Sequence, residues 1–293
     1  MGRFAPSPTG SLHLGSVATA LFASVRARQR GGRVVLRVED LDGPRVVAGS
    51  EQEQRDDLDW LGLEIDDAET LGLGPTRQSE RLSRYEVALA DFAARGLTYL
   101  CDCSRAEIAR VASAPHEGEE GLPYTGTCRP FGMEERAFKR PPSVRLAVPA
   151  DMGGAIDDFV LLRGDGVVAY QLAVVVDDLA MHISEIVRGA DLASSAPRQT
   201  LLATLLGGEL PPLLHVPVLV GRSGQRLAKR DGGSTVRELR ERGISAPRIL
   251  SAIARAYGQS VPAEVGVSEL AECFDPNKFP LGTVSLSHVE AAA

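Results

Sequence analysis

The sequence predicts an α/β fold that begins with a parallel β-sheet. A short apolar segment at residues 3–5 is followed by a loop with two prolines and then by a helical pattern over residues 12–30. A second segment, 33–39, is rich in Val and Leu and directly follows Gly31 and Gly32. A strand, a helix and a second buried strand in this order form a βαβ unit with parallel strands.

Composition limits the class of protein. The 293 residues can bury one core and a smaller subdomain. A net charge of −7 does not favour nucleic-acid binding over the whole surface, but local arginine clusters can still contact RNA. There are two such clusters, and each is slightly better explained as a solvated face. The first contains Arg26, Arg28, Arg30 and Arg33, and the second contains Arg237, Arg240 and Arg242. No apolar run reaches the roughly 20 residues of a membrane span and no signal peptide is evident, so we expect a cytoplasmic protein without membrane contact.

Further elements follow from apolar spacing and from capping residues. Ser104 with Glu107 three positions later forms a capping box, and Gly96 gives a helix its C-terminal stop. Helices are predicted at 50–61, 79–96, 104–111, 196–206, 235–242 and 246–257. Strands are predicted at 97–101, 144–148, 159–162, 167–170, 183–188 and 215–220.

The loop after the first strand has the features of a phosphate-binding site. Pro6 and Pro8 prevent a continuous strand ladder, so the chain turns tightly into the helix. His13 and backbone N–H groups then lie at a helix N-terminus, where partial positive charge favours phosphate. Glu39 and Asp40 fall at the carboxyl end of the second strand, where open α/β sheets bind ligands. An ordinary Pro- and Gly-rich connection would explain the loop alone equally well.

Three of the four cysteines flank an irregular segment. Cys101, Cys103 and Cys128 bracket most of 112–133, which is rich in Gly, Pro, Glu and Thr and too long for an unsupported loop in a compact domain. Three thiolates and one further ligand would complete a tetrahedral zinc site, and three free thiols are the alternative.

The residues alone leave the fourth metal ligand open between Tyr124, His116 and Asp102. General chemistry favours His116, because a phenol with a pKa of about 10 must lose its proton to bind a metal. The fourth cysteine, Cys273, has no partner in the sequence, and we expect it in the core.

Three stretches together resemble the first signature of the class I aminoacyl-tRNA synthetases, in the branch specific for glutamate. They are Arg3-Phe4-Ala5-Pro6-Ser7-Pro8-Thr9-Gly10, His13-Leu14-Gly15-Ser16 and Leu36-Arg37-Val38-Glu39-Asp40. The family has a second histidine where Ser16 stands, so one imidazole is missing from the phosphate side. The resemblance implies a Rossmann-like nucleotide-binding domain with a zinc-containing α+β insertion and a small C-terminal helical region.

Four segments are therefore expected. Residues 1–82 would form the first half of the Rossmann-like catalytic domain, and 83–167 the zinc-containing insertion. Residues 168–233 would form the second half of the catalytic domain with the ATP loop, and 234–293 the C-terminal helical region.

The resemblance also implies an amino-acid site. Glutamate has two carboxylates and one ammonium group, so its pocket needs at least two guanidinium donors and one carboxylate. Arg3 and Arg188 would supply the donors, Glu39 would accept from the ammonium group, and Tyr170 would add a directional hydroxyl. The positions that the family uses for L-glutamate correspond here to Arg3, Phe4, Ala5, Pro6, Ser7, Glu39, Tyr170 and Arg188.

The segment 224–233 resembles the second class I signature, Lys-Met-Ser-Lys-Ser. Lys229 matches the second lysine, Arg226 replaces the first, and Ala228 removes a hydroxyl. By resemblance the ATP-binding residues are His13, Gly15, Arg226, Leu227 and Lys229, with Mg²⁺ on the triphosphate. The catalytic residues would be His13, Ser16 and Lys229, which stabilise the phosphates while a glutamate carboxylate attacks the α-phosphorus of ATP.

Short paralogues of glutamyl-tRNA synthetase share this resemblance over almost the whole chain. Their Cys, Cys, Tyr, Cys metal set maps onto Cys101, Cys103, Tyr124 and Cys128, which implies Tyr124 rather than His116 as the fourth zinc ligand. Only 60 residues follow Gly233, so we expect no anticodon-binding domain. Such paralogues attach glutamate to queuosine in the anticodon stem-loop of tRNA(Asp), and we expect the same partner and a monomeric enzyme here.

Two alternatives stay open: a truncated enzyme that charges a tRNA 3′ end, and a non-catalytic RNA-binding paralogue. Val174 stands where ordinary glutamyl-tRNA synthetases have an amide residue, which argues against the first and predicts weak glutamate binding. The presence of His13, Glu39, Arg188 and Lys229 argues against the second.

Overall fold

The computed structural model describes residues 1–111, 124–150, 156–221, 224, 235–287 and 289. The chain divides into two compact units. Unit 1 comprises Met1–Glu80, His182–Ala193 and Pro211–Ala293, and unit 2 comprises Arg81–Met181 and Ser194–Leu210. The segment 168–233 is thus shared between the two units, and the four segments expected from the sequence stay predictions.

Unit 1 contains the parallel sheet expected from the βαβ pattern. β1 (Gly2–Phe4), β2 (Val34–Leu36) and β3 (Ile65–Asp67) pair in parallel in this order. β7 (Ile186–Gly189) and β8 (Leu213–Val216) form a second parallel pair. The N–H of Ser184 donates to the carbonyl of Met1 (2.8 Å), and an Arg3 nitrogen reaches the carbonyl of Val187 (2.8 Å). β1 and β7 therefore run side by side in the same direction, and the carboxyl ends of β1, β2 and β7 meet at one edge.

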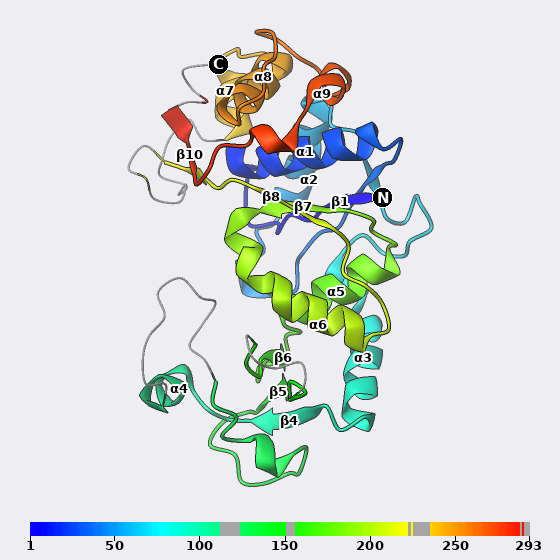
Figure 1. The fold of residues 1–293 in the computed structure, drawn as a ribbon, viewed down its shortest axis with the longest axis vertical. Coiled ribbons are helices and arrows are strands. Elements are labelled where there is room, and N and C mark those ends of the chain that lie inside the picture. Colours follow the sequence, from blue (N-terminus) through cyan, green and yellow to red (C-terminus); the bar gives the residue numbers. More distant parts are fainter. Residues whose placement is uncertain (112–123, 151–155, 222–223, 225–234, 288, 290–293) are drawn as a thin grey trace. The chain divides into compact units, whose positions relative to one another are not determined.

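Helix α1 (Leu14–Gln29) is the centre of unit 1, because its apolar residues are buried on several faces. Figure 1 shows α1 lying across the strands, with C-terminal helices on its other side. The helices of this unit are α1, α2 (Ser50–Trp60), α7 (Val236–Glu241), α8 (Ala246–Ala256) and α9 (Val267–Cys273). The ring of Phe22 in α1 lies 5.0–5.2 Å from the rings of Tyr257, Phe274 and Phe279, so aromatic packing attaches the C-terminal helices to α1.

Unit 2 combines an antiparallel sheet with helices. β4 (Thr98–Cys101), β5 (Ser143–Leu146) and β6 (Val160–Leu162) pair in this order. The helices are α3 (Leu82–Ala94), α4 (Arg105–Val111), α5 (Tyr170–Ala180) and α6 (Ala196–Leu205). The buried Asp177 of α5 accepts hydrogen bonds from Nε of Arg81 (2.6 Å) and from the hydroxyl of Tyr85 (2.8 Å). This buried charge pair holds α5 against the start of α3.

The strand predicted at 167–170 is wrong. Tyr170 begins α5, and Val168 forms only an isolated bridge with Leu162. The β-branched and aromatic residues of this stretch favour a strand locally. The packing of α5 against α3 and α6 in unit 2 outweighs that preference.

Other differences have simple causes. The strand predicted at 215–220 is interrupted at Pro217, which has no N–H: β8 ends before it, and β9 (Leu219–Val220) pairs instead with β10 (Val284–Ser285). The helix predicted from residue 79 begins at Leu82, and β3, α9 and β10 are not among the predicted elements. Cys273 is exposed at the end of α9, so the expected core position is wrong.

The remaining predicted helices and strands are confirmed, with boundaries that differ by a few residues. The capping box is confirmed too: the N–H of Ser104 donates to the Glu107 carboxylate (2.7 Å), and the N–H of Glu107 donates to the Ser104 hydroxyl (3.2 Å). Gly96 has φ of 68°, the left-handed conformation expected of a helix stop.

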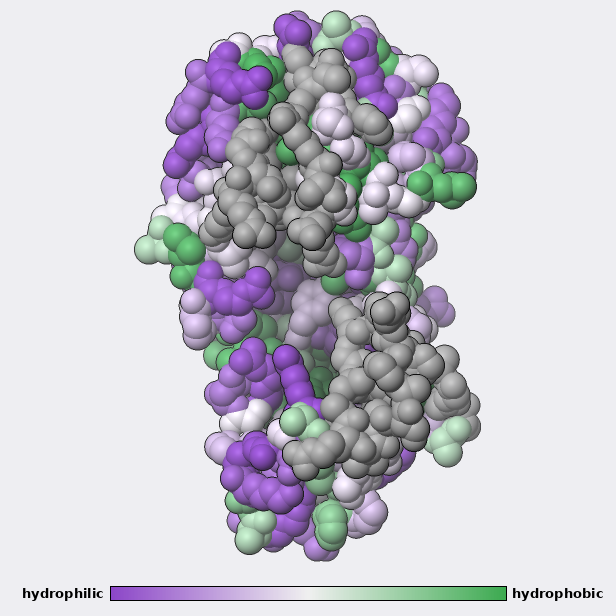
Figure 2. Space-filling model, turned by 90° about the vertical axis from the view of Figure 1, so that its left-hand side faces the viewer, coloured by the Kyte–Doolittle hydropathy of each residue, from purple (hydrophilic) through white to green (hydrophobic). Residues whose placement is uncertain are grey.

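Charged and polar groups dominate the visible surface. On the face shown in Figure 2, hydrophilic residues make up much of the described surface, and hydrophobic residues form small separate patches. No helix among the described residues is both long enough and apolar enough to cross a membrane.

Candidate active site and metal centre

His13 is the N-cap of α1 and is held by Ser16. Nδ1 of His13 accepts a hydrogen bond from the N–H of Ser16 (3.1 Å), and Nε2 lies 3.2 Å from the Ser16 hydroxyl. Burial lowers the pKa of His13 below its ordinary value, while the carboxylate of Asp191 opposes that shift. A neutral imidazole whose Nδ1 is an acceptor carries its proton on Nε2, so His13 can donate to a phosphate oxygen.

A cavity of about 460 Å³ opens beside His13 in unit 1. Its lining includes the start of α1, the residues after β7, the stretch 217–219 and Arg45. The lining residues from α1 and its N-cap are His13, Gly15, Ser16 and Thr19, and those after β7 include Asp191. The structure thus brings three predicted ATP-binding or catalytic residues to one cavity at a helix N-terminus, the arrangement that suits phosphate.

Gly15 is required by the position of the His13 ring. A Cβ atom at Gly15 would lie 3.1 Å from Nδ1 and 3.2 Å from Cε1 of His13, and 3.5 Å from Cβ of Leu219. Contacts this short to a carbon are tighter than ordinary packing, so a side chain here would displace the imidazole.

Helix α2 supports the loop before α1, and sequence reasoning missed this role. The buried Gln54 donates from Nε2 to the carbonyls of Gly10 (2.7 Å) and Ser7 (3.2 Å). The hydroxyl of Ser50 donates to the carbonyl of Pro8 (2.6 Å). These carbonyls need partners because the prolines interrupt the strand ladder. On a polar helix such as 50–60, no pattern in the sequence marks Ser50 and Gln54 as different from solvated residues.

Three charged residues predicted for the amino-acid site share one edge of the sheet in unit 1. Arg3 donates from Nη1 to the carbonyl of Val187, directly before Arg188 (2.8 Å). The N–H of Glu39 donates to the carbonyl of Pro6 (2.9 Å), so Glu39 lies beside the loop that follows β1. Both arginines are buried, with 5% and 3% of their surface exposed. Two buried guanidinium groups and a carboxylate match the charges of a dicarboxylic amino acid.

Two neighbours of these residues were also missed. Nε of Arg188 donates to Nε2 of His215 (3.3 Å), which lies opposite it in β8. Burial and the charge of Arg188 lower the pKa of His215, so its imidazole stays a neutral acceptor. Arg37 is fully buried, and its Nη2 lies 3.4 Å from Oε1 of Glu39. A charged or titratable residue inside an otherwise apolar strand was the only signal that the sequence offered.

The other predicted glutamate-binding residues of unit 1 follow β1. The side chain of Phe4 packs in the hydrophobic core, so only its backbone is available to a ligand. Ala5, Pro6 and Ser7 lie in the loop directly after β1. Tyr170 is the first residue of α5 in unit 2, and its place in the amino-acid site stays a prediction.

The predicted ATP loop falls largely outside the described residues, which here include only Gly224. Arg226, Leu227 and Lys229 are among those not described, so their roles stay predictions. His116, one of the three metal-ligand candidates, is also outside the described part of the chain.

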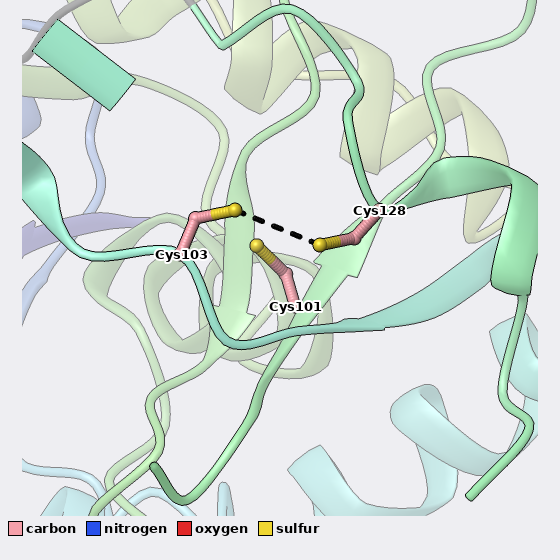
Figure 3. A group of neighbouring side chains, drawn as sticks. All are labelled: Cys101, Cys103 and Cys128. Atoms are coloured by element: carbon pink, nitrogen blue, oxygen red, sulfur yellow. Dashed lines mark hydrogen bonds between the residues drawn. The ribbon is translucent and has the colours of Figure 1, made fainter. Parts of the chain in front are cut away.

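Three cysteines of unit 2 form a compact cluster. Figure 3 shows the sulfur atoms of Cys101, Cys103 and Cys128 pointing toward one another. All three lie within 4.8 Å of one another, and the sulfurs of Cys103 and Cys128 are 3.6 Å apart. The hydroxyl oxygen of Tyr124 lies 3.3 Å from the Cys101 sulfur and 3.9 Å from the Cys103 sulfur. The cluster can hold a metal ion, with Tyr124 beside it.

Tyr124 and Asp102, the two candidate fourth ligands in the described part of the chain, differ in their surroundings. The guanidinium of Arg145 lies 4.0 Å from the centroid of the Tyr124 ring, where its charge favours a phenolate. Burial and the hydrogen bond to Cys101 raise the pKa of the metal-free phenol. The Asp102 carboxylate lies 3.8 Å from the Cys128 sulfur and already accepts from the N–H of Lys139 (3.0 Å).

The chain as a whole is similar to one family of enzymes. Residues 1–275 match the family described as tRNA synthetases class I (E and Q), catalytic domain. The parallel sheet and the cavity at His13 therefore belong to a class I synthetase fold, and the chain belongs to this family.

Relatives within the family narrow the assignment. A glutamyl-Q tRNA(Asp) synthetase from Symbiobacterium thermophilum is 42% identical, with 100% of this chain and 97% of that protein covered. A glutamate–tRNA ligase from Nitrosospira multiformis is 38% identical over 93% of this chain but only 61% of its own length. The crystal structure of a glutamate tRNA ligase from Elizabethkingia meningosepticum, in complex with its amino acid, has a TM-score of 0.80 at 26% identity, covering 99% of this chain and 68% of that one. Within the class I family, the chain belongs with the glutamyl-Q tRNA(Asp) synthetases.

Proposed function

We propose that the protein activates L-glutamate with ATP, without tRNA, and transfers the glutamyl group to the cyclopentenediol of queuosine in the tRNA(Asp) anticodon. One observation carries the first step: the cavity at His13 and the Arg3, Glu39 and Arg188 side chains all lie in unit 1, on helix α1 and on the adjacent parallel strands β1, β2 and β7 and the segments that follow them. The match along nearly the full length of a glutamyl-Q tRNA(Asp) synthetase supports the second step.

In the first step a carboxylate oxygen of glutamate attacks the α-phosphorus of ATP, which gives glutamyl-adenylate and pyrophosphate. Arg3 and Arg188 would hold the carboxylates of glutamate, and Glu39 would accept from its ammonium group. Nε2–H of His13 would donate to a phosphate oxygen, and Arg45, which lines the cavity, would add a positive charge. Donors fixed before the reaction stabilise charge that develops on the phosphates. Mg²⁺ on the triphosphate would neutralise further charge.

In the second step a hydroxyl of the queuosine cyclopentenediol attacks the glutamyl carbonyl, an ester bond forms, and AMP leaves with the bonding electrons. The diol has the cis arrangement of a terminal ribose, so a site built for a tRNA 3′ end can accept it. Bases in RNA loops are the ones most readily presented to a protein site.

We further propose one structural zinc ion, held by Cys101, Cys103, Tyr124 and Cys128. With Zn–S of about 2.3 Å and Zn–O of about 2.0 Å, tetrahedral geometry puts ligand atoms roughly 3.5–3.8 Å apart. The distances of 3.3, 3.6 and 3.9 Å among these atoms fit that spacing. Zinc at this position would tie the end of β4 to the segment around Tyr124.

Metal analysis tests the zinc site. Protein purified without chelators should contain about one equivalent of zinc, and Cys103→Ser should lose most of it. Less than half an equivalent in the wild-type protein would contradict the proposal, and Cys273→Ser, outside the cluster, is the matched control.

Two assays test the reaction. Pyrophosphate exchange with glutamate and ATP should proceed without tRNA, and transfer should require tRNA(Asp) that carries queuosine. Glu39→Gln should abolish exchange, while Glu80→Gln, an exposed glutamate paired with Arg77, should not. Transfer that survives the loss of queuosine would indicate charging of the 3′ end, and absence of exchange would indicate an RNA-binding protein. We also propose a cytoplasmic monomer, which should elute at the mass of one 31.2 kDa chain.

A further inference from the structure

One carboxylate of α2 contacts two segments that meet at His13. The hydroxyl of Ser11 donates to Oε1 of Glu53 (2.7 Å). Nη2 of Arg237, in the first turn of α7, lies 2.5 Å from the same oxygen. Glu53 therefore joins the loop that precedes α1 to the helix α7, although the two are more than 200 residues apart in the sequence.

The backbone joins the same two segments. The N–H of Val236 donates to the carbonyl of Leu12 (3.2 Å), and Thr235 forms an antiparallel bridge with His13. Val236 is fully buried, and Thr235 caps α7 through a capping box with Glu238. The backbone of Leu12 and His13 is thus bonded to the start of α7, and the side chain of Ser11 is bonded to Glu53.

A second pair of side chains reinforces the contact between α2 and α7. The guanidinium of Arg240 lies 5.2 Å from the centroid of the Trp60 ring. Glu53, Asp57 and Trp60 follow one another at helical spacing, so they lie along one face of α2. Arg237 and Arg240 face this side of the helix, and their charges act on Asp57 as well.

We propose that Glu53 and Arg237 are positioning residues for His13. Neither is among the described residues that line the cavity, so their effect on the reaction would pass through the segment 11–13. Arg237 is 58% exposed, and ion pairs with an exposed partner contribute little to overall stability. The pair is therefore expected to affect the placement of the imidazole much more than unfolding. This inference rests on the proposed activation of glutamate with ATP.

The first test is a mutant cycle on the full chain. Glu53→Gln keeps an acceptor for Ser11 but removes the negative charge, and Arg237→Gln removes the positive one. Each should lower kcat of pyrophosphate exchange about ten-fold with a smaller change in KM for ATP, because a misplaced catalytic group costs turnover. The double variant should be no slower than either single variant. The urea midpoint, followed by the fluorescence of the single tryptophan, Trp60, should stay at the wild-type value.

The decisive arm repeats Glu53→Gln in a His13→Asn background. Asparagine keeps an N-cap acceptor for α1 but removes the imidazole. If Glu53 acts through His13, its substitution should then have less than a two-fold effect. The proposal would be overturned if Glu53→Gln lowered kcat by the same factor in the His13→Asn background as in the wild type. It would also be overturned if Glu53→Gln alone exchanged pyrophosphate at the wild-type rate.

Glu51→Gln is the matched control. Glu51 lies two residues away in α2 and pairs with Arg55 and Arg77 rather than with the loop, so exchange should stay at the wild-type rate. If wild-type protein shows no exchange at all, the proposed function fails, but the cycle can be read by calorimetry with ATP alone. Glu53→Gln should then weaken ATP binding when His13 is present and should not weaken it in the His13→Asn background. If the wild type and Glu53→Gln bound ATP with equal affinity, the positioning role would be refuted.

Discussion

The substitution Gly15→Ala is expected to separate activity from stability. Gly15 is the second residue of α1, where alanine is at least as favourable as glycine for the helix. The new Cβ would, however, lie 3.1 and 3.2 Å from two atoms of the His13 ring. We therefore expect an unfolding free energy within about 1 kcal/mol of the wild type, because the helix preference of alanine offsets the weakened N-cap bond of His13, together with a clear loss of pyrophosphate exchange.

The size of the loss follows from the geometry. Relief of the contact requires the imidazole to move by a few tenths of an ångström, which lengthens its bonds of 3.1 and 3.2 Å to Ser16 and shifts Nε2 in the cavity. Complete removal of one preorganised donor costs about 10²–10³ in rate. A displaced donor retains part of its effect, so kcat/KM for ATP should fall by roughly 10- to 100-fold.

Pyrophosphate exchange and urea unfolding of the same preparations measure the two effects. Gly32→Ala is the control, because its Cβ would come no closer than 3.4 Å to another atom, the carbonyl oxygen of Ala27. Full exchange activity in Gly15→Ala would refute the reasoning, and so would a stability that falls in parallel with activity.

Three further substitutions test other parts of the structure. Tyr124→Phe keeps the ring under Arg145 but removes the oxygen, so zinc should pass to a chelator at least ten-fold more readily, as a chromogenic competition assay can show. Asp57→Asn removes a carboxyl group whose pKa is raised to about 6 by burial and by nearby carboxylates. The stability that the protonated form provides is fully present below about pH 4 and is lost as the pH rises through 6. The unfolding free energy of the variant should therefore exceed that of the wild type by about 2 kcal/mol at pH 7.5 and equal it at pH 4, as urea unfolding can show. A gain independent of pH would contradict this cause. Asp177→Asn removes the buried anion that binds Arg81 and should lower the unfolding free energy by about 3–5 kcal/mol; a loss below about 1 kcal/mol would show that the pair is dispensable.

The sequence was sufficient for elements whose pattern is local. The βαβ start, the capping box at Ser104 and the stop at Gly96 depend on spacing and on residues within one turn, and all three are confirmed. The predictions fail where contacts between segments distant in the sequence determine the secondary structure. Residues 167–170 have strand-forming side chains, yet Tyr170 starts a helix that packs on α3 and α6.

For the candidate site, sequence reasoning found the residues whose chemistry is unusual and missed those that hold them. A histidine after a Pro- and Gly-rich loop and arginines at strand ends carry their own signal. Gln54 does not, because its importance comes from the carbonyls that it meets only in the folded chain. Arg37 has one signal, a charge inside an apolar strand, but that signal does not reveal its contact with the Glu39 carboxylate. The proposed metal site shows the same limit: residue chemistry alone favours His116, and only the folded chain puts the guanidinium of Arg145 over the Tyr124 ring.

The hydrogen bonds from Gln54 and Ser50 have a thermodynamic consequence. The carbonyls of Ser7, Pro8 and Gly10 accept these hydrogen bonds without any ligand, so this turn would lose little conformational entropy if it bound one. Affinity contributed by this side of the site is therefore not offset by a cost of ordering the polypeptide. The rigidity that two prolines alone do not ensure is conferred by α2 through these hydrogen bonds.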